Sequence, residues 1–186
     1  MEPIFVISSI LLWIVVLFNL LLTIALIHRG SPKRTQSNVN TMKIGSLAPD
    51  FEAETLNGKT VTLTDYARKS VAFVFISPAC PPCIESIPTL NTLGPHARRA
   101  GVELVLVNTT SKADAAAFVE EYDVKLPVLV APQGTNRFVD DYKVNGTPFF
   151  CFIKNSRVES AGFLDNKWAI LSQQWRNVDA VIQQGV

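Results

Sequence analysis

The sequence predicts a three-layer α/β domain with a mixed central sheet, preceded by one long apolar helix. Residues 3–27 carry no charged side chain, although 18% of the whole chain is charged. Further along, continuous apolar runs alternate with stretches of helical periodicity, which favours a sheet covered on both faces. The last two predicted strands are joined by a short polar turn and are therefore antiparallel, which makes the sheet mixed.

The apolar segment is predicted to be a transmembrane anchor over residues 1–28. As a helix, its uncharged stretch would rise roughly 37 Å, and a hydrocarbon core is about 30 Å thick. A cleavable signal peptide starts with basic residues, whereas this chain starts Met1-Glu2-Pro3 and becomes basic only after the apolar stretch. A buried core helix is the weaker alternative, because such helices rarely run so long without a polar face.

Residues 29–42 are rich in Ser, Asn, Thr and basic side chains and predict a flexible linker, which leaves residues 43–186 as a single domain. Acidic and basic residues nearly balance after residue 34, so there is no electrostatic reason to expect nucleic-acid binding. The chain has 3 cysteines and 2 histidines, too few for a disulfide scaffold or a metal cage.

The first half of the domain predicts two strands, a helix, a strand and a second helix. Thr60–Leu63 alternates like a half-buried strand, and Val71–Ile76 is an apolar run suited to the centre of the sheet. A helix is expected from Cys80 to about Ala100, followed by a strand over Val102–Val107. Lys112–Tyr122 has the apolar spacing of an amphipathic helix.

The second half predicts shorter elements and then a hairpin. Leu129 is expected in a short strand and Asn136–Tyr142 in a short helix. Phe149–Ile153 and Val158–Phe163 are expected to pair across a turn at residues 154–157. The final helix carries an apolar stripe expected to face the core: Trp168, Leu171, Trp175, Val178 and Ile182.

Cys80 and Cys83 are the clearest chemical feature, because a Cys-Pro-Pro-Cys segment directly follows the central strand and begins a helix. At a helix start, unpaired N–H groups and the helix dipole stabilise a thiolate, so Cys80 is the expected nucleophile, with a lowered pKa. Cys83, one turn further on, is the expected resolving thiol, which would attack a mixed disulfide between Cys80 and a substrate. No cofactor is expected beyond a redox-active disulfide between these two residues.

Pro81 and Pro82 are tolerated in the first helical turn, where the N–H groups are unpaired anyway. Because both lack a donor, we expect the pKa of Cys80 to be lowered less than in a motif without a proline at position 81. No metal is expected, since a zinc site needs four ligands, no second Cys-x-x-Cys is present, and His96 lies a helix length away.

Thr147 and Pro148 form a second feature, since this proline stands after a glycine turn and directly before an apolar strand. An X-Pro bond can be cis at modest cost, and a proline there leaves the edge of the preceding residue open to a partner. An ordinary trans proline at a strand start is the alternative.

These segments make the chain similar to the membrane-anchored thioredoxin-like family of the TlpA, ResA and CcmG type, and within it to the MauD branch of methylamine utilisation proteins. The resemblance covers nearly the whole chain. It is carried by the apolar start around Leu12-Trp13, Gly45–Phe51, Leu56–Lys59, Phe75–Cys83, Pro88, Thr147–Pro148 and Gly162.

The resemblance implies a thioredoxin-like domain of the redoxin or AhpC-TSA type over residues 43–186, with an extra strand and helix around residues 110–132. It implies that Cys80 is the nucleophile and Cys83 the resolving thiol. It also implies that Pro88 kinks the active-site helix, that Pro148 is cis and packs against the disulfide, and that the Thr147 backbone binds an extended substrate segment.

Three positions depart from the family pattern. Ala79 stands where thioredoxins usually have Trp, and Val74 stands where they have a buried acid that helps to deprotonate the second cysteine. Ser86 stands where ResA-type proteins have a glutamate, and Glu85 is one residue out of register. Proton transfer at Cys83 is therefore expected to use water or Glu85.

Cys151 lies on a predicted strand between Phe150 and Phe152. The favoured interpretation is an inert, buried small hydrophobe, because free cysteine is among the most buried residue types. A third redox thiol is the alternative.

The favoured function is a membrane-tethered thiol–disulfide oxidoreductase, and the resemblance implies that it assists the maturation of a secreted or periplasmic protein. Its expected partners are protein thiols or disulfides, an electron donor or acceptor protein in the membrane, and the lipid bilayer around residues 3–27; no nucleic acid is expected.

A thiol peroxidase is the main alternative, since Ser77 precedes Cys80 as in peroxiredoxins, although Phe73 replaces their proline. A metal-delivery or docking module is a third alternative.

Two observations disagree about the side of the membrane. Arg29, Lys33 and Arg34 follow the span, and the positive-inside rule taken alone puts the domain in the cytoplasm. The family resemblance puts it outside, where a thiol oxidoreductase needs a tether to be retained. We expect a single-pass protein of the cell membrane whose domain is extracytoplasmic, on the periplasmic side.

Overall fold

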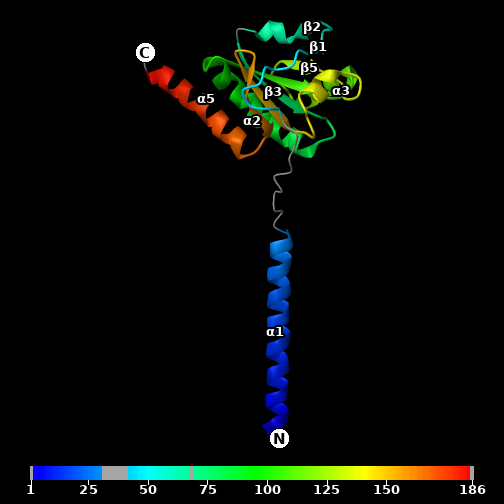
Figure 1. The fold of residues 1–186 in the computed structure, drawn as a ribbon, viewed down its shortest axis with the longest axis vertical. Helices are drawn as coiled ribbons and strands as arrows, with labels where there is room; N and C mark the ends of the chain where they lie inside the picture. The colour runs from blue at the N-terminus through cyan, green and yellow to red at the C-terminus, as the bar shows by residue number, and fades with distance from the viewer. Residues whose placement is uncertain (1, 31–41, 68, 185–186) are drawn as a thin grey trace. The chain divides into compact units, whose positions relative to one another are not determined.

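The computed structural model describes residues 2–30, 42–67 and 69–184, whose fold is drawn in Figure 1. The chain divides into two compact units, Met1–Val39 and Asn40–Val186. Among the described residues, the first unit consists of one helix, and the second contains the sheet with the remaining helices.

Helix α1 (Glu2–Gly30) is continuous and extends past the predicted end at residue 28. Its described apolar side chains, Leu12 among them, are exposed. Asn19 and Thr23 each donate one hydrogen bond to the helix backbone: Asn19 Nδ2 donates to the carbonyl oxygen of Val15 at 3.3 Å, and Thr23 Oγ1 donates to that of Asn19 at 2.8 Å. In the part of the chain that the structure describes, no helix reaches the length and hydropathy needed to span a membrane.

The predicted linker over residues 29–42 lies mostly outside the described residues, because residues 31–41 are not described. Met42, at its predicted end, is 7% exposed and belongs to the same core as Phe51 and Leu63. The packed domain therefore includes Met42.

The domain is built on a mixed seven-stranded sheet with strand order β2-β1-β5-β4-β3-β6-β7. The three central strands β3, β4 and β5 are parallel, and the flanking pairs are antiparallel, as the fold class predicts. The strands are β1 (Glu52–Thr55), β2 (Thr60–Thr62), β3 (Ser70–Ile76), β4 (Val102–Asn108), β5 (Val128–Val130), β6 (Phe149–Lys154) and β7 (Arg157–Phe163).

Helices cover both faces of the sheet, so the predicted three layers are confirmed (Figure 1). Helices α2, α3 and α5 pack on one face, and α4 packs on the other together with the chain before β1. The helices are the 3-10 helix η1 (Leu63–Tyr66), α2 (Pro81–Arg99), α3 (Lys112–Glu121), α4 (Arg137–Asp141) and α5 (Asn166–Gln184).

Alternate residues of β3 divide the core into two clusters, because successive strand side chains point to opposite faces. Val74 and Ile76 face α2 and α5, where Trp168 packs. Phe73 faces the other side, where Phe51 and Phe138 stack with ring centroids 3.8 Å apart. Every residue from Val71 to Ile76 is fully buried, which explains the unbroken apolar run in the sequence.

Two local features were not anticipated from the sequence. Strand β1 is not expected from the sequence, because Glu and Ala are poor strand formers. Its exposure nevertheless alternates as in a half-buried strand: Glu52 is exposed and Ala53 is buried. Leu63 lies in η1 rather than in the preceding strand. The Thr62 N–H donates to the Asp65 carboxylate at 2.8 Å, which caps the helical turn and ends β2.

Candidate active site

Cys80 lies at the N-cap of α2, in the short loop that follows Ile76, the last residue of β3. Its N–H donates to the carbonyl oxygen of Ser77 at 3.1 Å, which closes a tight turn between strand and helix. Its own carbonyl accepts from Cys83 N–H at 3.0 Å and from Ile84 N–H at 3.2 Å, so the helix begins immediately after it. Pro81 and Pro82 occupy the first two helical positions, as predicted.

The two cysteines of this motif differ in access to solvent. Cys80 is partly exposed, whereas Cys83 is 0% exposed, and both are free thiols. Burial, with a further contribution from the hydrogen bond to Cys80, raises the pKa of Cys83 to about 11. The arrangement therefore presents one accessible sulfur with a protonated, shielded thiol beside it.

The Thr147–Pro148 loop lies against the first cysteine. The Thr147–Pro148 peptide bond is cis, which confirms the expectation. The Cys80 thiol donates to the carbonyl oxygen of Thr147 at 3.4 Å. This contact follows from the sheet: β6 begins at Phe149, which pairs with Phe75 near the end of β3, so the two loops emerge at the same sheet edge.

The groups around Cys83 differ from those of a thioredoxin with a buried acid. Val74 is buried in the same cluster as Cys83. The Ser86 hydroxyl donates to the backbone carbonyl of Cys83 at 2.6 Å, and Glu85 is exposed on the helix surface. The contacts that shift the pKa of Cys83 come from Cys80, Ser77 and Thr147, none of which is a carboxylate.

Pro88 lies inside α2 and is exposed. Because proline has no N–H, it removes one hydrogen bond from the interior of the helix. A role for Pro88 in bending α2 stays a prediction.

Cys151 is separated from the other cysteines by the sheet. It is fully buried in the cluster with Phe73 and Val158, on the face opposite that of Cys83. Burial raises the pKa of Cys151 to about 12. Its surroundings favour the interpretation as a buried small hydrophobe over a third redox thiol.

Thr109 is a supporting residue that the sequence did not single out. Its N–H and its hydroxyl both donate to the carbonyl oxygen of Ile76, at 3.0 and 3.1 Å. Ile76 is the last residue of β3, so Thr109 fastens the start of the loop that carries Cys80. A polar residue directly after the apolar strand β4, at the same sheet edge as Cys80, was the available signal.

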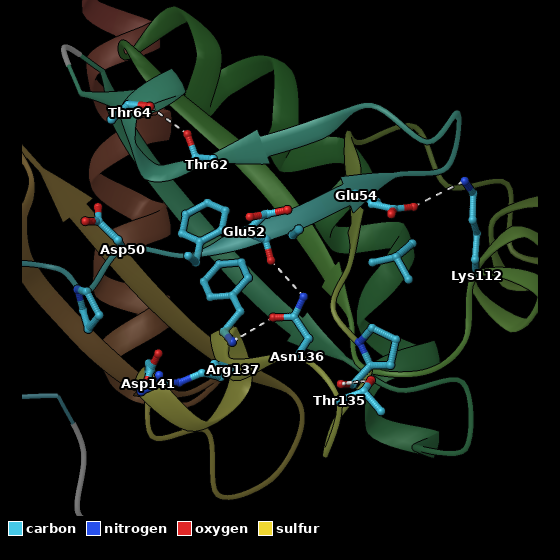
Figure 2. Close-up of a pocket in the computed structure, with 16 residues that line it drawn as sticks. Asp50, Glu52, Glu54, Thr62, Thr64, Lys112, Thr135, Asn136, Arg137 and Asp141 are labelled. Carbon is cyan, nitrogen blue, oxygen red and sulfur yellow. Dashed lines mark hydrogen bonds and ion pairs between the residues drawn. The ribbon is translucent and has the colours of Figure 1, made fainter.

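A separate groove of about 1050 Å³ lies along β1, shown in Figure 2. Lys112 pairs with Glu54 at 3.7 Å across it, and Asn136 Nδ2 donates to the backbone oxygen of Glu52 at 2.8 Å. Neither cysteine of the motif nor the Thr147–Pro148 loop lines this groove. The two cysteines of the motif and the groove therefore occupy different parts of the domain.

Solved structures resemble this domain over most of its length. A candidate thiol:disulfide interchange protein DsbE from Chlorobium tepidum is 26% identical, with a TM-score of 0.63 over 75% of this chain and 99% of that one. The exposed lipoprotein thioredoxin Etrx1 from Streptococcus pneumoniae strain TIGR4 is 29% identical, with a TM-score of 0.58 over 69% and 99%. These likenesses support the thioredoxin-like fold.

Curated relatives are named thiol-disulfide oxidoreductase ResA. The protein from Geobacillus thermodenitrificans (strain NG80-2) is 33% identical over 118 residues, which are 62% of this chain and 67% of the relative. The protein from Bacillus cereus (strain ATCC 10987 / NRS 248) is 35% identical over 100 residues, 53% and 57% of the two chains. The chain thus spans about half to two thirds of the length of such relatives, and they support thiol–disulfide oxidoreductase activity.

The family model named AhpC/TSA family matches residues 44–170. That match contains both cysteines of the motif, the Thr147–Pro148 loop and all strands of the sheet. The chain belongs to the AhpC/TSA family.

Proposed function

We propose that this protein is a thiol–disulfide oxidoreductase that exchanges disulfides with protein substrates through Cys80 and Cys83. The observation that carries the proposal is the pairing of a partly exposed Cys80 with a buried Cys83 at a helix start, facing the Thr147–Pro148 loop. The ResA relatives and the fold support the same chemistry.

In the first step, the Cys80 thiolate attacks one sulfur of a substrate disulfide. A bond forms between Cys80 Sγ and that sulfur, the substrate S–S bond breaks, and the other substrate sulfur leaves as a thiolate. Thr147 and Pro148 lie beside Cys80, so the backbone of this loop is placed to bind an extended segment around the substrate cysteine.

In the second step, Cys83 loses its proton and attacks Cys80 Sγ. The Cys80–Cys83 disulfide forms, the bond between Cys80 and the substrate breaks, and that substrate sulfur leaves as a thiolate. Two electrons pass from the Cys80–Cys83 pair to the substrate, and the reverse sequence oxidises a substrate dithiol. Because Glu85 is exposed, water or the thiolate released in the first step accepts the Cys83 proton.

We further propose that α1 anchors the domain in the cell membrane, with the domain on the extracytoplasmic side. The uncharged stretch of residues 3–27 supports this, and so do the internal hydrogen bonds of Asn19 and Thr23, which reduce the number of side-chain donors that need a partner outside the helix. The partners would then be an extracytoplasmic protein whose cysteines need reduction or oxidation during maturation, as in the MauD branch, and a membrane protein that supplies or accepts electrons.

Two measurements test the activity. The purified full chain, reduced and mixed with a protein disulfide, is expected to reduce it, and Cys80→Ser is expected to remove this activity. Hydrogen peroxide offered to the same preparation separates the main alternative: fast, saturable turnover of peroxide without disulfide exchange would replace the proposal with a thiol peroxidase.

The location is tested separately by labelling intact cells with a membrane-impermeant maleimide after mild reduction. A mass increase on Cys80 supports an extracytoplasmic domain. Labelling only after lysis would contradict it.

A further inference from the structure

Phe163 is a large apolar side chain that stays exposed at the end of β7. It is 40% exposed, although β7 carries it next to the buried Phe149. The two rings meet edge to face with centroids 5.7 Å apart. A Cβ atom on Gly146 would lie 3.4 Å from the Phe163 ring, so this ring lies close to Gly146. The ring is therefore held in place on one side and open to solvent on the other.

This fixed ring lies beside the reactive loop. Gly146 directly precedes Thr147, whose carbonyl oxygen is 3.4 Å from Cys80 Sγ. Leu164, the residue after Phe163, donates its N–H to the carbonyl oxygen of Pro148 at 3.4 Å. Phe163 therefore lies next to the cis-proline loop, with its ring near Gly146 and the following residue bonded to Pro148, so a segment bound at Thr147 would pass close to it.

The two segments that meet at Cys80 carry no charged side chain, and the first charged residue after Phe163 in the sequence is Asp165. Residues 77–84 and 144–150 contain no charged side chain. Ala79, Pro81 and Pro82 are exposed next to Cys80, which extends the apolar rim on the helix side of the sulfur. A charged substrate segment would lose hydration here without gaining a partner from these two stretches, whereas an apolar one would gain from burial.

We propose that Phe163 is a specificity-determining residue that binds an apolar side chain next to the reacting cysteine of an extended polypeptide. The inference rests on the proposed function, since it concerns the substrate of the same site. An aromatic ring already fixed by Gly146 and Phe149 loses little conformational freedom when a substrate covers it, so most of the gain from burial appears as binding.

The test uses the reduced full chain in detergent and peptides with one cysteine, activated as a mixed disulfide with thionitrobenzoate. Attack by Cys80 on the peptide sulfur releases coloured thionitrobenzoate, so each rate is read directly. Two peptides differ only in Leu or Ser beside the cysteine, and the thionitrobenzoate disulfide of 2-mercaptoethanol serves as a probe without a peptide.

The wild type is expected to prefer the Leu peptide over the Ser peptide by about fivefold in the second-order rate constant of thionitrobenzoate release, the effect of burying part of one apolar side chain. Phe163→Ser is expected to abolish this preference and to leave the mercaptoethanol probe unchanged, while Phe163→Leu keeps part of it. Leu47→Ser is the matched control, because Leu47 is 66% exposed and bridges to Arg157 at the opposite end of β7. It is expected to behave as the wild type.

Each other outcome overturns the inference in a recognisable way. Equal rates for the two peptides in the wild type overturn the role of Phe163 and leave the proposed function intact. Equal slowing of all three probes by Phe163→Ser, with Phe163→Leu no better, assigns the residue a purely structural role. A wild type that releases thionitrobenzoate from none of the probes overturns the proposed function together with the inference.

Discussion

The thiol of Cys80 donates a hydrogen bond to the carbonyl oxygen of Thr147 at 3.4 Å, across 67 positions of sequence. The contact joins the start of α2 to the loop before β6, and the pairing of β3 with β6 brings these two segments together. Any substrate sulfur bonded to Cys80 therefore starts next to the backbone of Thr147. The sulfur proposed to react and the backbone proposed to bind the substrate are therefore positioned at the same edge of the sheet.

Cys83→Ser is expected to trap the mixed disulfide between Cys80 and a substrate protein. Without the Cys83 thiol the second attack cannot occur, so the mixed disulfide on Cys80 persists when no other thiol is added. Non-reducing electrophoresis and mass spectrometry of the purified variant measure the adduct. Cys80→Ser is the control and should form none, so an adduct in that variant would assign the nucleophile to another cysteine.

The reduced protein is expected to lose stability in alkaline solution. Burial raises the pKa of Cys83 from 9.0 to about 11, so between these values the unfolded chain has released a proton that the folded chain keeps. Stability from this group is intact below about pH 9 and falls as pH rises through the window. By about pH 10.5 the Tm of the reduced wild type should have dropped roughly 4–8 °C further than that of Cys83→Ala. Parallel Tm curves for the two proteins would contradict this.

Cys151→Ser is expected to lower the free energy of unfolding by about 1–3 kcal/mol without changing the rate of disulfide exchange. The substitution places a hydroxyl in a fully buried apolar cluster, on the sheet face away from Cys83. Urea unfolding measures the first effect and thionitrobenzoate release the second. A folded Cys151→Ser protein with lost exchange activity would restore the alternative of a third redox thiol.

Thr109→Val is expected to destabilise the domain by about 1 kcal/mol and to slow alkylation of Cys80. The variant keeps the shape of the side chain but removes one of the two hydrogen bonds that Thr109 donates to Ile76. Thr109→Ser retains the hydroxyl and should keep the wild-type alkylation rate. If the Val and Ser variants alkylate equally fast, the loop before Cys80 is held by other contacts.

Glu85→Gln is expected to change the decay of the mixed disulfide by less than about twofold. The side chain is exposed on α2, and the contacts that act on the Cys83 thiol come from other residues. Stopped-flow measurement of the second step across pH compares the variant with the wild type. A loss of the pH dependence in Glu85→Gln would assign the proton transfer to this carboxylate.

Elements with strong patterns could be predicted from the sequence. The apolar run of β3 and the prolines at the start of α2 fix their own local structure, so Cys80 could be placed at a helix start. The hairpin turn could also be predicted from the sequence. In the structure Asn155 and Ser156 lie in this turn with φ of 51° and 59°, as a tight turn between antiparallel strands requires.

Features that depend on pairing between distant segments could not be predicted. Strand β1 is a poor strand sequence that is held by β2 and β5 on its two sides. The sequence shows Thr109 only as a polar residue after an apolar strand, and its contact with Ile76 depends on the register that pairs Ile76 with Asn108. The role of Phe163 depends on a contact with Gly146, which no periodicity reveals.

Cys151 lies on the sheet face opposite that of Cys83, and this position limits which disulfide the folded chain can form. Three cysteines allow three different disulfides in an unfolded chain, and two of them would include Cys151. Once the sheet has formed, Cys151 and Cys83 lie on opposite faces, and Cys80 packs with Cys83. A chain that folds before it meets an oxidant can close only the bond between Cys80 and Cys83, so it needs no isomerase to correct its own pairing.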